Sequence, residues 1–145
     1  PIDDIGQFLT LASIVERETG IAGERPHVAS VFVNRLRKGM RLQSDPTFLY
    51  GVYGGAGKPS GKPVTQSDID SDTPYNTYKI KGLPPGPIAL PGRAALEAVA
   101  NPLETKDIYF VADGTGGHVF AETLDEHNRN VRDYRALERQ NRAEQ

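Results

Sequence analysis

Two carboxylates close the first apolar run of the chain and are its strongest candidates for chemistry. The run covers residues 8–19, with Glu16 and Glu18 near its end. At about 100° per residue, Glu16 continues the broader of two apolar stripes on a helix, whereas Glu18 lies beside the narrower one. The broader stripe contains Ile5, Phe8, Leu9 and Ala12, and the narrower one contains Leu11 and Ile14. The broader stripe favours Glu16 as the carboxylate that faces the core.

A carboxyl group at the end of an apolar stripe has two physical outcomes. It pairs with a cation, or desolvation raises its pKa until it can donate a proton near neutral pH. Arg17, Arg35 and Arg41 are possible cationic partners. On this helix alone the ion pair is the commoner outcome, so the structural and catalytic interpretations both stay open.

Other chemistries find little support among the residue types. His27, His118 and His127 are scattered and have no ligand spacing, which argues against a metal, and no motif calls for a cofactor. His127 fits a packed, singly hydrogen-bonded side chain, whereas His118 opens a strand beside a glycine-rich turn and could face a cleft. The serines lack a nucleophile elbow, and the turn at residues 113–117 leads into a strand rather than into the helix of a phosphate loop.

Length and composition indicate one soluble globular domain. The chain has 145 residues, of which 37% are hydrophobic and 25% charged. Its net charge of −2 and pI near 5.9 give a nucleic-acid partner no electrostatic support. The absence of cysteine excludes disulfides and thiol nucleophiles, and no apolar run approaches the roughly 20 residues of a membrane helix. Because the sequence starts almost inside its first helix, we expect a piece of a longer protein.

A helical hairpin is predicted at the N-terminus. Asp3 or Asp4 caps a helix that runs to about Thr19. A second helix starts near Pro26 and stops at Gly39 after only a short connection. A brief third segment with Asp45-Pro46 at its start should be helical through Tyr50.

Two glycine- and proline-rich segments interrupt the middle of the chain. Residues 51–64 form a surface insertion or a lid over a cleft. A capping box at residues 65–68 opens one short helical turn. Residues 82–92 contain four Pro and three Gly, so they form neither a helix nor a central strand but a rigid wall.

The C-terminal third predicts a short helix, a β-hairpin and a last helix. The helix covers residues 93–100, and residues 107–112 and 118–120 are the two strands. Thr123 with Glu126 caps a helix whose thin apolar stripe packs on one side, and residues 139–145 should fray. The expected fold is therefore α+β, with a helical hairpin, a small antiparallel sheet and a packed last helix.

The remaining polar side chains on loops suit a sugar, which has hydroxyls around its rim and apolar C–H faces. Carboxylates, amides and tyrosines supply both kinds of contact. These residues are Glu16, Gln43, Asp45, Tyr50, Tyr75, Asn76 and Tyr78. Many other polar clefts have the same composition, so this observation only indicates a direction.

Six blocks of the chain, in consistent order, resemble the catalytic domain of the MltG or YceG-like endolytic murein transglycosylases. They read LASIVERET, VASVFVNRL, MRLQSDPT, PYNTY, GLPPGPI and YFVADGTGGH, and they start at residues 11, 28, 40, 74, 82 and 109. One departure is Leu90, where such proteins more usually carry a polar residue, which puts a substrate contact from that side chain in doubt. By this resemblance residues 1–145 are one catalytic domain.

The resemblance implies cleavage of the β-1,4 bond between N-acetylmuramic acid and N-acetylglucosamine, leaving a 1,6-anhydromuramic end. It assigns the catalytic carboxylate to the first Glu of its block, Glu16, which would act as acid and then as base. Gln43, Asp45, Tyr75, Asn76 and His118 are the expected substrate-binding residues. Asp45 could instead be only a helix cap, Tyr75 and Tyr78 only core aromatics, and Glu18 a partner for an arginine. The six cations from Arg17 through Arg41 could help to hold an anionic glycan.

Two rival functions stay open at this point. A muramidase would hydrolyse the same bond with Asp45 as its second carboxylate, and a non-catalytic module would only bind peptidoglycan. The resemblance also implies a membrane anchor upstream of these residues, an extracytoplasmic location, and partners in cell-wall synthesis complexes.

Overall fold

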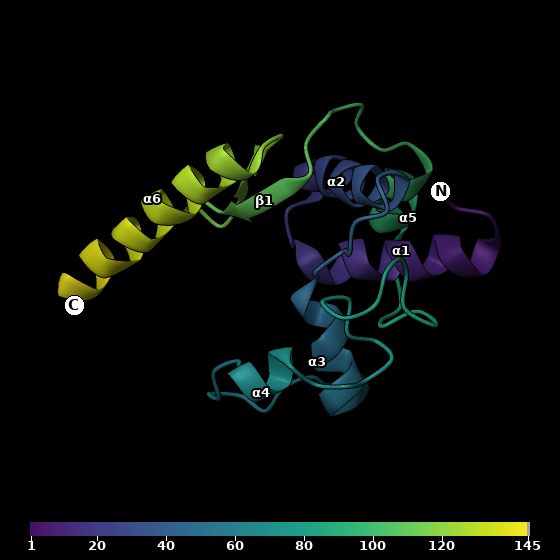
Figure 1. The fold of residues 1–145 in the computed structure, drawn as a ribbon, viewed down its shortest axis with the longest axis horizontal. Coiled ribbons are helices and arrows are strands. Elements are labelled where there is room, and N and C mark those ends of the chain that lie inside the picture. Colours follow the sequence, from purple (N-terminus) through teal and green to yellow (C-terminus); the bar gives the residue numbers. More distant parts are fainter. Residues whose placement is uncertain (145) are drawn as a thin grey trace.

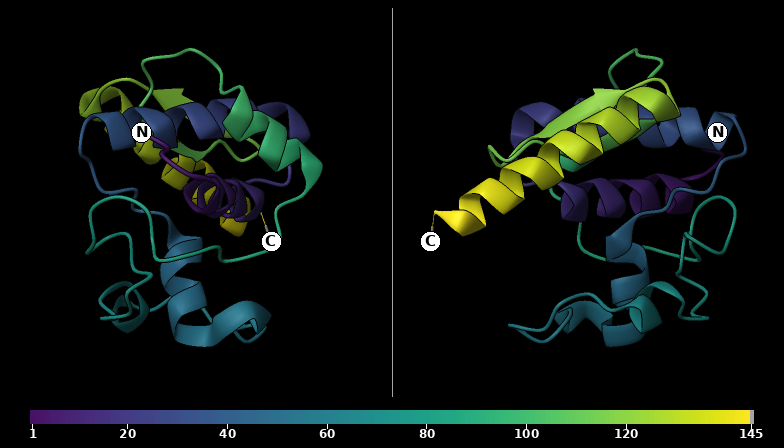
Figure 2. Two further views of the ribbon diagram at one scale, coloured as in Figure 1. Left: turned by 90° about the vertical axis from the view of Figure 1, so that its right-hand side faces the viewer. Right: turned by 60° about the vertical axis from the view of Figure 1, so that its left-hand side comes forward.

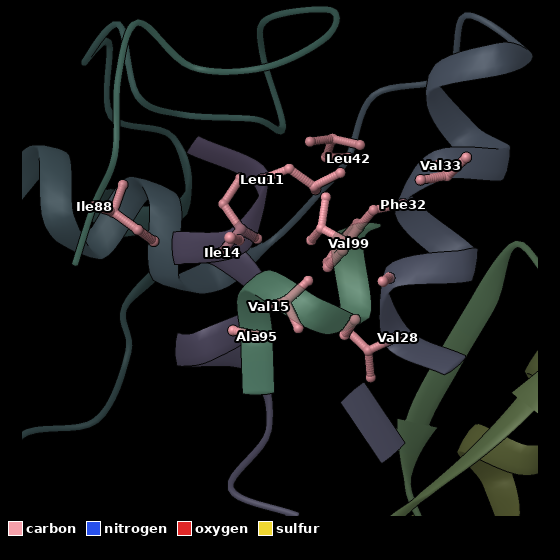
Figure 3. Close-up of a cluster of buried hydrophobic side chains, with 13 residues drawn as sticks. Leu11, Ile14, Val15, Val28, Phe32, Val33, Leu42, Ile88, Ala95 and Val99 are labelled. Carbon is pink, nitrogen blue, oxygen red and sulfur yellow. The ribbon is translucent and has the colours of Figure 1, made fainter. Parts of the chain in front are cut away.

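The computed structural model describes residues 1–144, and three helices form its central layer (Figure 1). These are α1 (Ile5–Glu18), α2 (Arg25–Arg37) and α5 (Arg93–Ala100). Side chains from all three meet in one apolar core, shown in Figure 3. The largest fully buried members include Phe32, Leu11, Ile14, Val15 and Val28. This core fixes the C-terminal end of α1, where both candidate carboxylates lie.

The N-terminal helical hairpin is confirmed. Asp4 caps α1 by accepting a hydrogen bond from the Gln7 N–H at 2.8 Å. A single 3₁₀ turn, η1 (Ala22–Glu24), leads into α2, which has a proline in its first turn. The chain leaves α2 through Gly39 at φ +70°, a conformation that glycine adopts without strain.

Below this layer in Figure 1, α3 (Asp45–Tyr53), η2 (Gly54–Ala56) and α4 (Gln66–Ile69) form a smaller helical unit. The predicted capping box of α4 is present, with Thr65 and Asp68 bonding each other's backbone N–H groups. The prediction that α3 ends at Tyr50 was wrong, because the helix continues for three more residues. Gly51 lies inside this continuation and packs closely against Thr73, since a Cβ at Gly51 would lie 2.1 Å from Thr73 Oγ1.

The β-hairpin is confirmed, with β1 (Tyr109–Ala112) antiparallel to β2 (His118–Ala121). The last helix, α6 (Leu124–Ala143), packs along both strands, and its far end projects beyond the rest of the chain (Figure 2). Leu137 lies so close to Gly114, at φ +90°, that a Cβ would be 2.2 Å from the Leu137 Cδ2 atom. The predicted fraying from residue 139 is not found, because helical structure continues to Ala143; residue 145 lies outside the described residues.

The observed class is the predicted α+β class, with helices and a two-stranded antiparallel sheet that α6 covers. Among residues 1–144, no helix combines the length and the apolar character that crossing a membrane requires.

Candidate active site

A cleft of about 540 Å³ lies where the end of α1, the start of α3, α2, the β-hairpin and α6 come together. Phe32, Leu42 and Phe110 line its apolar side. Its polar side is contributed by elements far apart in the sequence. The polar groups that matter here are Glu18, Arg35, Gln43, Asp45, Tyr78 and His118. The cleft therefore combines two carboxylates, a cation and neutral hydrogen-bonding groups against apolar walls, as a sugar site requires.

Glu18 is the carboxylate of α1 that lines this cleft. Its Oε2 atom accepts a hydrogen bond from the Ser44 hydroxyl at 2.7 Å. Burial raises the pKa of Glu18 from 4.5 to about 7, the Asp45 charge adds to this rise, and the Ser44 hydrogen bond opposes it. Glu18 is therefore protonated in about half of the molecules at neutral pH, as a general acid should be.

Asp45 lies on the other side of the cleft at the start of α3. The Tyr78 hydroxyl donates to Asp45 Oδ1 at 2.5 Å. Burial and this hydrogen bond raise the pKa of Tyr78 well above its ordinary value, so its hydroxyl stays a proton donor to Asp45. Asp45 thus supplies a fixed negative charge beside Glu18 and disfavours ionisation of Glu18.

Arg35 is a buried cation in the same wall. Its Nε donates to the Ile108 carbonyl at 2.7 Å, and its Nη1 donates to the carbonyl of Arg41 at 3.0 Å. Within the described part of the chain no carboxylate pairs with it, and burial lowers its pKa. Nη1 also lies 3.4 Å from Gln43 Oε1, and Gln43 adopts φ +51°, unusual for a residue other than glycine. Such backbone conformations concentrate at functional sites.

Two histidines complete the cleft on the hairpin side. His118 is held by Glu24, whose Oε2 lies 3.2 Å from His118 Nδ1 and accepts the His118 backbone N–H at 3.0 Å. His127 stacks on Tyr109 with ring centroids 4.8 Å apart, and burial together with the Arg35 charge lowers its pKa. The predicted packing of His127 is confirmed. Its predicted hydrogen bond is not found at Nδ1, which is buried without a partner among the described residues.

Glu16 lies on another side of α1 and does not line the cleft. Its Oε1 accepts the Gly92 backbone N–H at 2.6 Å, which caps the start of α5. Its Oε2 pairs with Arg25 Nη2 at 3.5 Å. Glu16 faces packed structure, as the broader apolar stripe predicts, but this structure is the start of α5 and an ion pair with Arg25. Of the two glutamates of α1, it is therefore Glu18 that lines the cleft.

Tyr75 and Asn76 also lie outside the cleft, contrary to the expected substrate contacts. Tyr75 packs edge-on against Tyr50, with ring centroids 4.9 Å apart, at the margin of the core. Asn76 has no exposed surface. Its amide donates to the carbonyls of Ile69 and Ser71, both at 2.8 Å, and its Oδ1 accepts the Tyr78 N–H at 3.0 Å. Asn76 is thus the internal brace of the loop that presents Tyr78.

Replacing Asn76 by Ala should lower the free energy of unfolding by about 3 kcal/mol, because three backbone groups lose their partner. Chemical denaturation would measure this, with Asn128→Ala on an exposed turn of α6 as the matched control. We expect the control to change stability by less than about 0.5 kcal/mol. Equal midpoints for both variants would contradict the role of Asn76 as a brace.

Sequence reasoning ranked two of these cleft residues too low. Glu18, beside the narrower stripe of Leu11 and Ile14, was ranked below Glu16 and was expected to be a partner for an arginine. The side chains of Leu11 and Ile14 are both fully buried. The sequence left open whether Tyr78 contacts substrate or packs in the core. In the structure its ring packs on Phe48, and its hydroxyl donates a hydrogen bond to Asp45 in the cleft.

Within residues 1–144, no group of three or more His, Asp or Glu side chains comes together as metal ligands. We therefore name no metal-binding residues.

Comparison with known proteins places the chain in a sequence family. The profile of the YceG-like family matches residues 2–133. The chain is 46% identical over 125 residues to an endolytic murein transglycosylase of Bacillus subtilis, covering 86% of this chain and 33% of the relative. It is 38% identical over 131 residues to an endolytic murein transglycosylase of Streptococcus pneumoniae, covering 90% of this chain and 24% of that protein.

A solved structure agrees with these relatives. The crystal structure of a YceG-like protein from Listeria monocytogenes superposes with a TM-score of 0.78 at 44% identity, covering 86% of this chain and 39% of that one. The chain thus spans about a third or less of the curated relatives that it matches.

Proposed function

Because this chain belongs to the YceG-like family, we propose that it is the catalytic domain of an endolytic lytic transglycosylase that cleaves peptidoglycan glycan strands. Glu18 is its catalytic residue in this proposal. One observation carries the assignment: Glu18 is the glutamate of α1 that lines the cleft, and its pKa is raised to about 7. Two relatives named endolytic murein transglycosylases support the choice of substrate.

The reaction needs only one carboxyl group. Protonated Glu18 donates its proton to the glycosidic oxygen as the bond from C1 of the muramyl sugar breaks. The C6 hydroxyl of the same sugar then closes on C1, and the Glu18 carboxylate takes the hydroxyl proton. Because that nucleophile is tethered to the reacting ring, tethering supplies up to about 7–11 kcal/mol of the barrier and no second protein nucleophile is required.

The other cleft residues keep Glu18 in its working state and hold the sugar. Burial raises the pKa of Glu18, and the charge of Asp45, which accepts the Tyr78 hydroxyl, adds to this rise. Gln43 and His118 face the same space and present amide and imidazole groups to sugar hydroxyls or N-acetyl oxygens. Arg35, which pairs with no carboxylate within residues 1–144, supplies a positive charge to the wall of the same cleft.

The products distinguish this function from its nearest rival. Asp45 lies in the same cleft as Glu18, so a muramidase with Asp45 as second carboxylate would hydrolyse the same bond. We expect mass spectrometry of digested purified peptidoglycan to show 1,6-anhydromuramic ends. These ends are about 18 mass units lighter than reducing ends, because no water is added. Reducing ends would establish hydrolysis instead, and intact strands that still bind the protein would identify a binding module.

The family also supports a proposal about where the domain works. We propose that it acts outside the cytoplasm, where peptidoglycan lies, as one part of a longer membrane-anchored protein that meets cell-wall synthesis complexes. The names of the relatives support the cell-wall substrate, and their greater length supports the presence of further parts. Detection of the full-length protein in membrane fractions, with this domain accessible to external protease, would test the placement.

A further inference from the structure

A second, smaller pocket lies next to the cleft, at the junction between α1 and α3. Its volume is about 190 Å³. Arg17 lines it while the next residue, Glu18, lines the cleft, and Pro46 lines it while the preceding residue, Asp45, lines the cleft. The two spaces therefore adjoin at this junction. We call this space the Arg17 pocket.

The Arg17 pocket has a positive rim. Arg17 and Lys58 line it, and no Asp or Glu side chain does so among the lining residues described. Lys58 is already held, since its ammonium lies 3.8 Å from Asp68 Oδ2 and donates to the Pro63 carbonyl. Arg17 is exposed and makes no ion pair within residues 1–144. The uncompensated charge of this rim is therefore the Arg17 guanidinium.

The other walls of the pocket are apolar or lack side chains. Leu49, Tyr50 and Ile88 form the apolar surface. Gly54 and Gly57 contribute bare backbone at φ +72° and +75°, so this wall of the 51–64 segment favours glycine at both positions. The volume matches about six water molecules at their share of liquid volume. Such a space accepts small apolar side chains next to one carboxylate.

Resting on the proposed function, we propose that the Arg17 pocket binds a carboxylate of the short peptide attached to the muramyl sugar in the cleft. Muramyl peptides combine small alanyl side chains with carboxylates, which are the two chemistries that the walls and the rim offer. A guanidinium binds a carboxylate through paired, charge-assisted hydrogen bonds. The pocket would thereby select peptide-bearing strands and give the 51–64 segment a role in substrate choice.

Binding of two matched probes tests this inference without any need for cleavage. The probes are N-acetylmuramyl-L-alanyl-D-glutamic acid and the same compound with both carboxyl groups amidated. NMR titration of the isotope-labelled chain should show the acid binding about tenfold more tightly than the amide, with shifts at Arg17, Tyr50 and Gly57. Arg17→Gln should remove this preference. Lys58→Gln should reduce it by less, because Lys58 already has an acidic neighbour.

Arg139→Gln is the matched control, since it removes one exposed positive charge at the far end of α6. It should leave the preference for the acid unchanged. The inference is overturned if the wild-type chain binds both probes equally or binds neither, or if Arg17→Gln keeps the preference. Strand cleavage is measured separately. A wild-type chain that prefers the acid but cleaves no strands would overturn only the proposed function. A wild-type chain that cleaves strands but shows no preference for the acid would overturn only this inference.

Discussion

Replacing Glu18 by Gln should reduce glycan cleavage by a factor of about 10² to 10⁴ or more, because the proton donor and acceptor of both steps is lost. Gln has nearly the same size as Glu and still accepts the Ser44 hydrogen bond. The fold should therefore be kept, and binding of strands should survive. Release of soluble fragments from purified peptidoglycan, followed over time, measures the rate.

Glu16→Gln is the matched control, with the same chemical change two residues away on the same helix. It keeps an oxygen that can accept the Gly92 N–H and loses only the charge that faces Arg25. We expect it to retain cleavage within about threefold, while its free energy of unfolding falls by about 1 kcal/mol. If Glu16→Gln were inactive and Glu18→Gln active, the catalytic assignment would return to Glu16, as the sequence resemblance implies.

The pH dependence of cleavage should follow the ionisation of Glu18. With a pKa of about 7, the protonated fraction falls tenfold for each pH unit well above neutrality, and the initial rate should fall with it. Rates measured between pH 5 and pH 9 would show this alkaline limb. A rate that stays constant from pH 6 to pH 9 would contradict Glu18 as the acid.

The same ionisation links pH to stability, and the sign is fixed by the direction of the shift. The pKa of Glu18 is higher in the folded chain, at about 7, than its ordinary value of 4.5, so the folded state holds a proton that the unfolded state has lost. This contribution is complete below about pH 4.5 and is lost as pH rises to 7. The raised pKa of Glu18 corresponds to at most about 3 kcal/mol in the free energy of unfolding. The actual contribution is smaller, because the side chain is only half-buried and solvent screens it.

Glu18→Gln isolates this contribution from the other titrating groups. Denaturant midpoints of the wild-type chain should fall relative to those of Glu18→Gln between pH 5 and pH 7.5, with the variant the more stable of the two at the upper end. Parallel curves across that range would show that Glu18 does not titrate with a raised pKa.

Much of the fold was predictable because its signals are local. The Asp4 cap, the Thr65 capping box, the proline that opens α2 and the glycine-rich turn between β1 and β2 each act within a few residues. The end of α3 was mispredicted because a glycine-rich sequence is typical of a loop. Gly51 nevertheless lies inside the helix, where close packing against Thr73 leaves no room for a Cβ.

The two glutamates of α1 show what the sequence alone leaves open. Its pattern established that α1 ends with a glutamate on each of two apolar sides, and residues 10–15 are indeed buried all round the helix. Which side faces an open cleft depends on what packs there. The N-terminus of α5 covers Glu16, whereas Ser44, Asp45 and the β-hairpin leave Glu18 in a cleft. The sequence thus determined the two alternatives, an ion-paired carboxylate or one with a raised pKa. Tertiary packing gave the ion pair to Glu16 and the raised pKa to Glu18, because desolvation depends on neighbours more than 20 residues away in the chain.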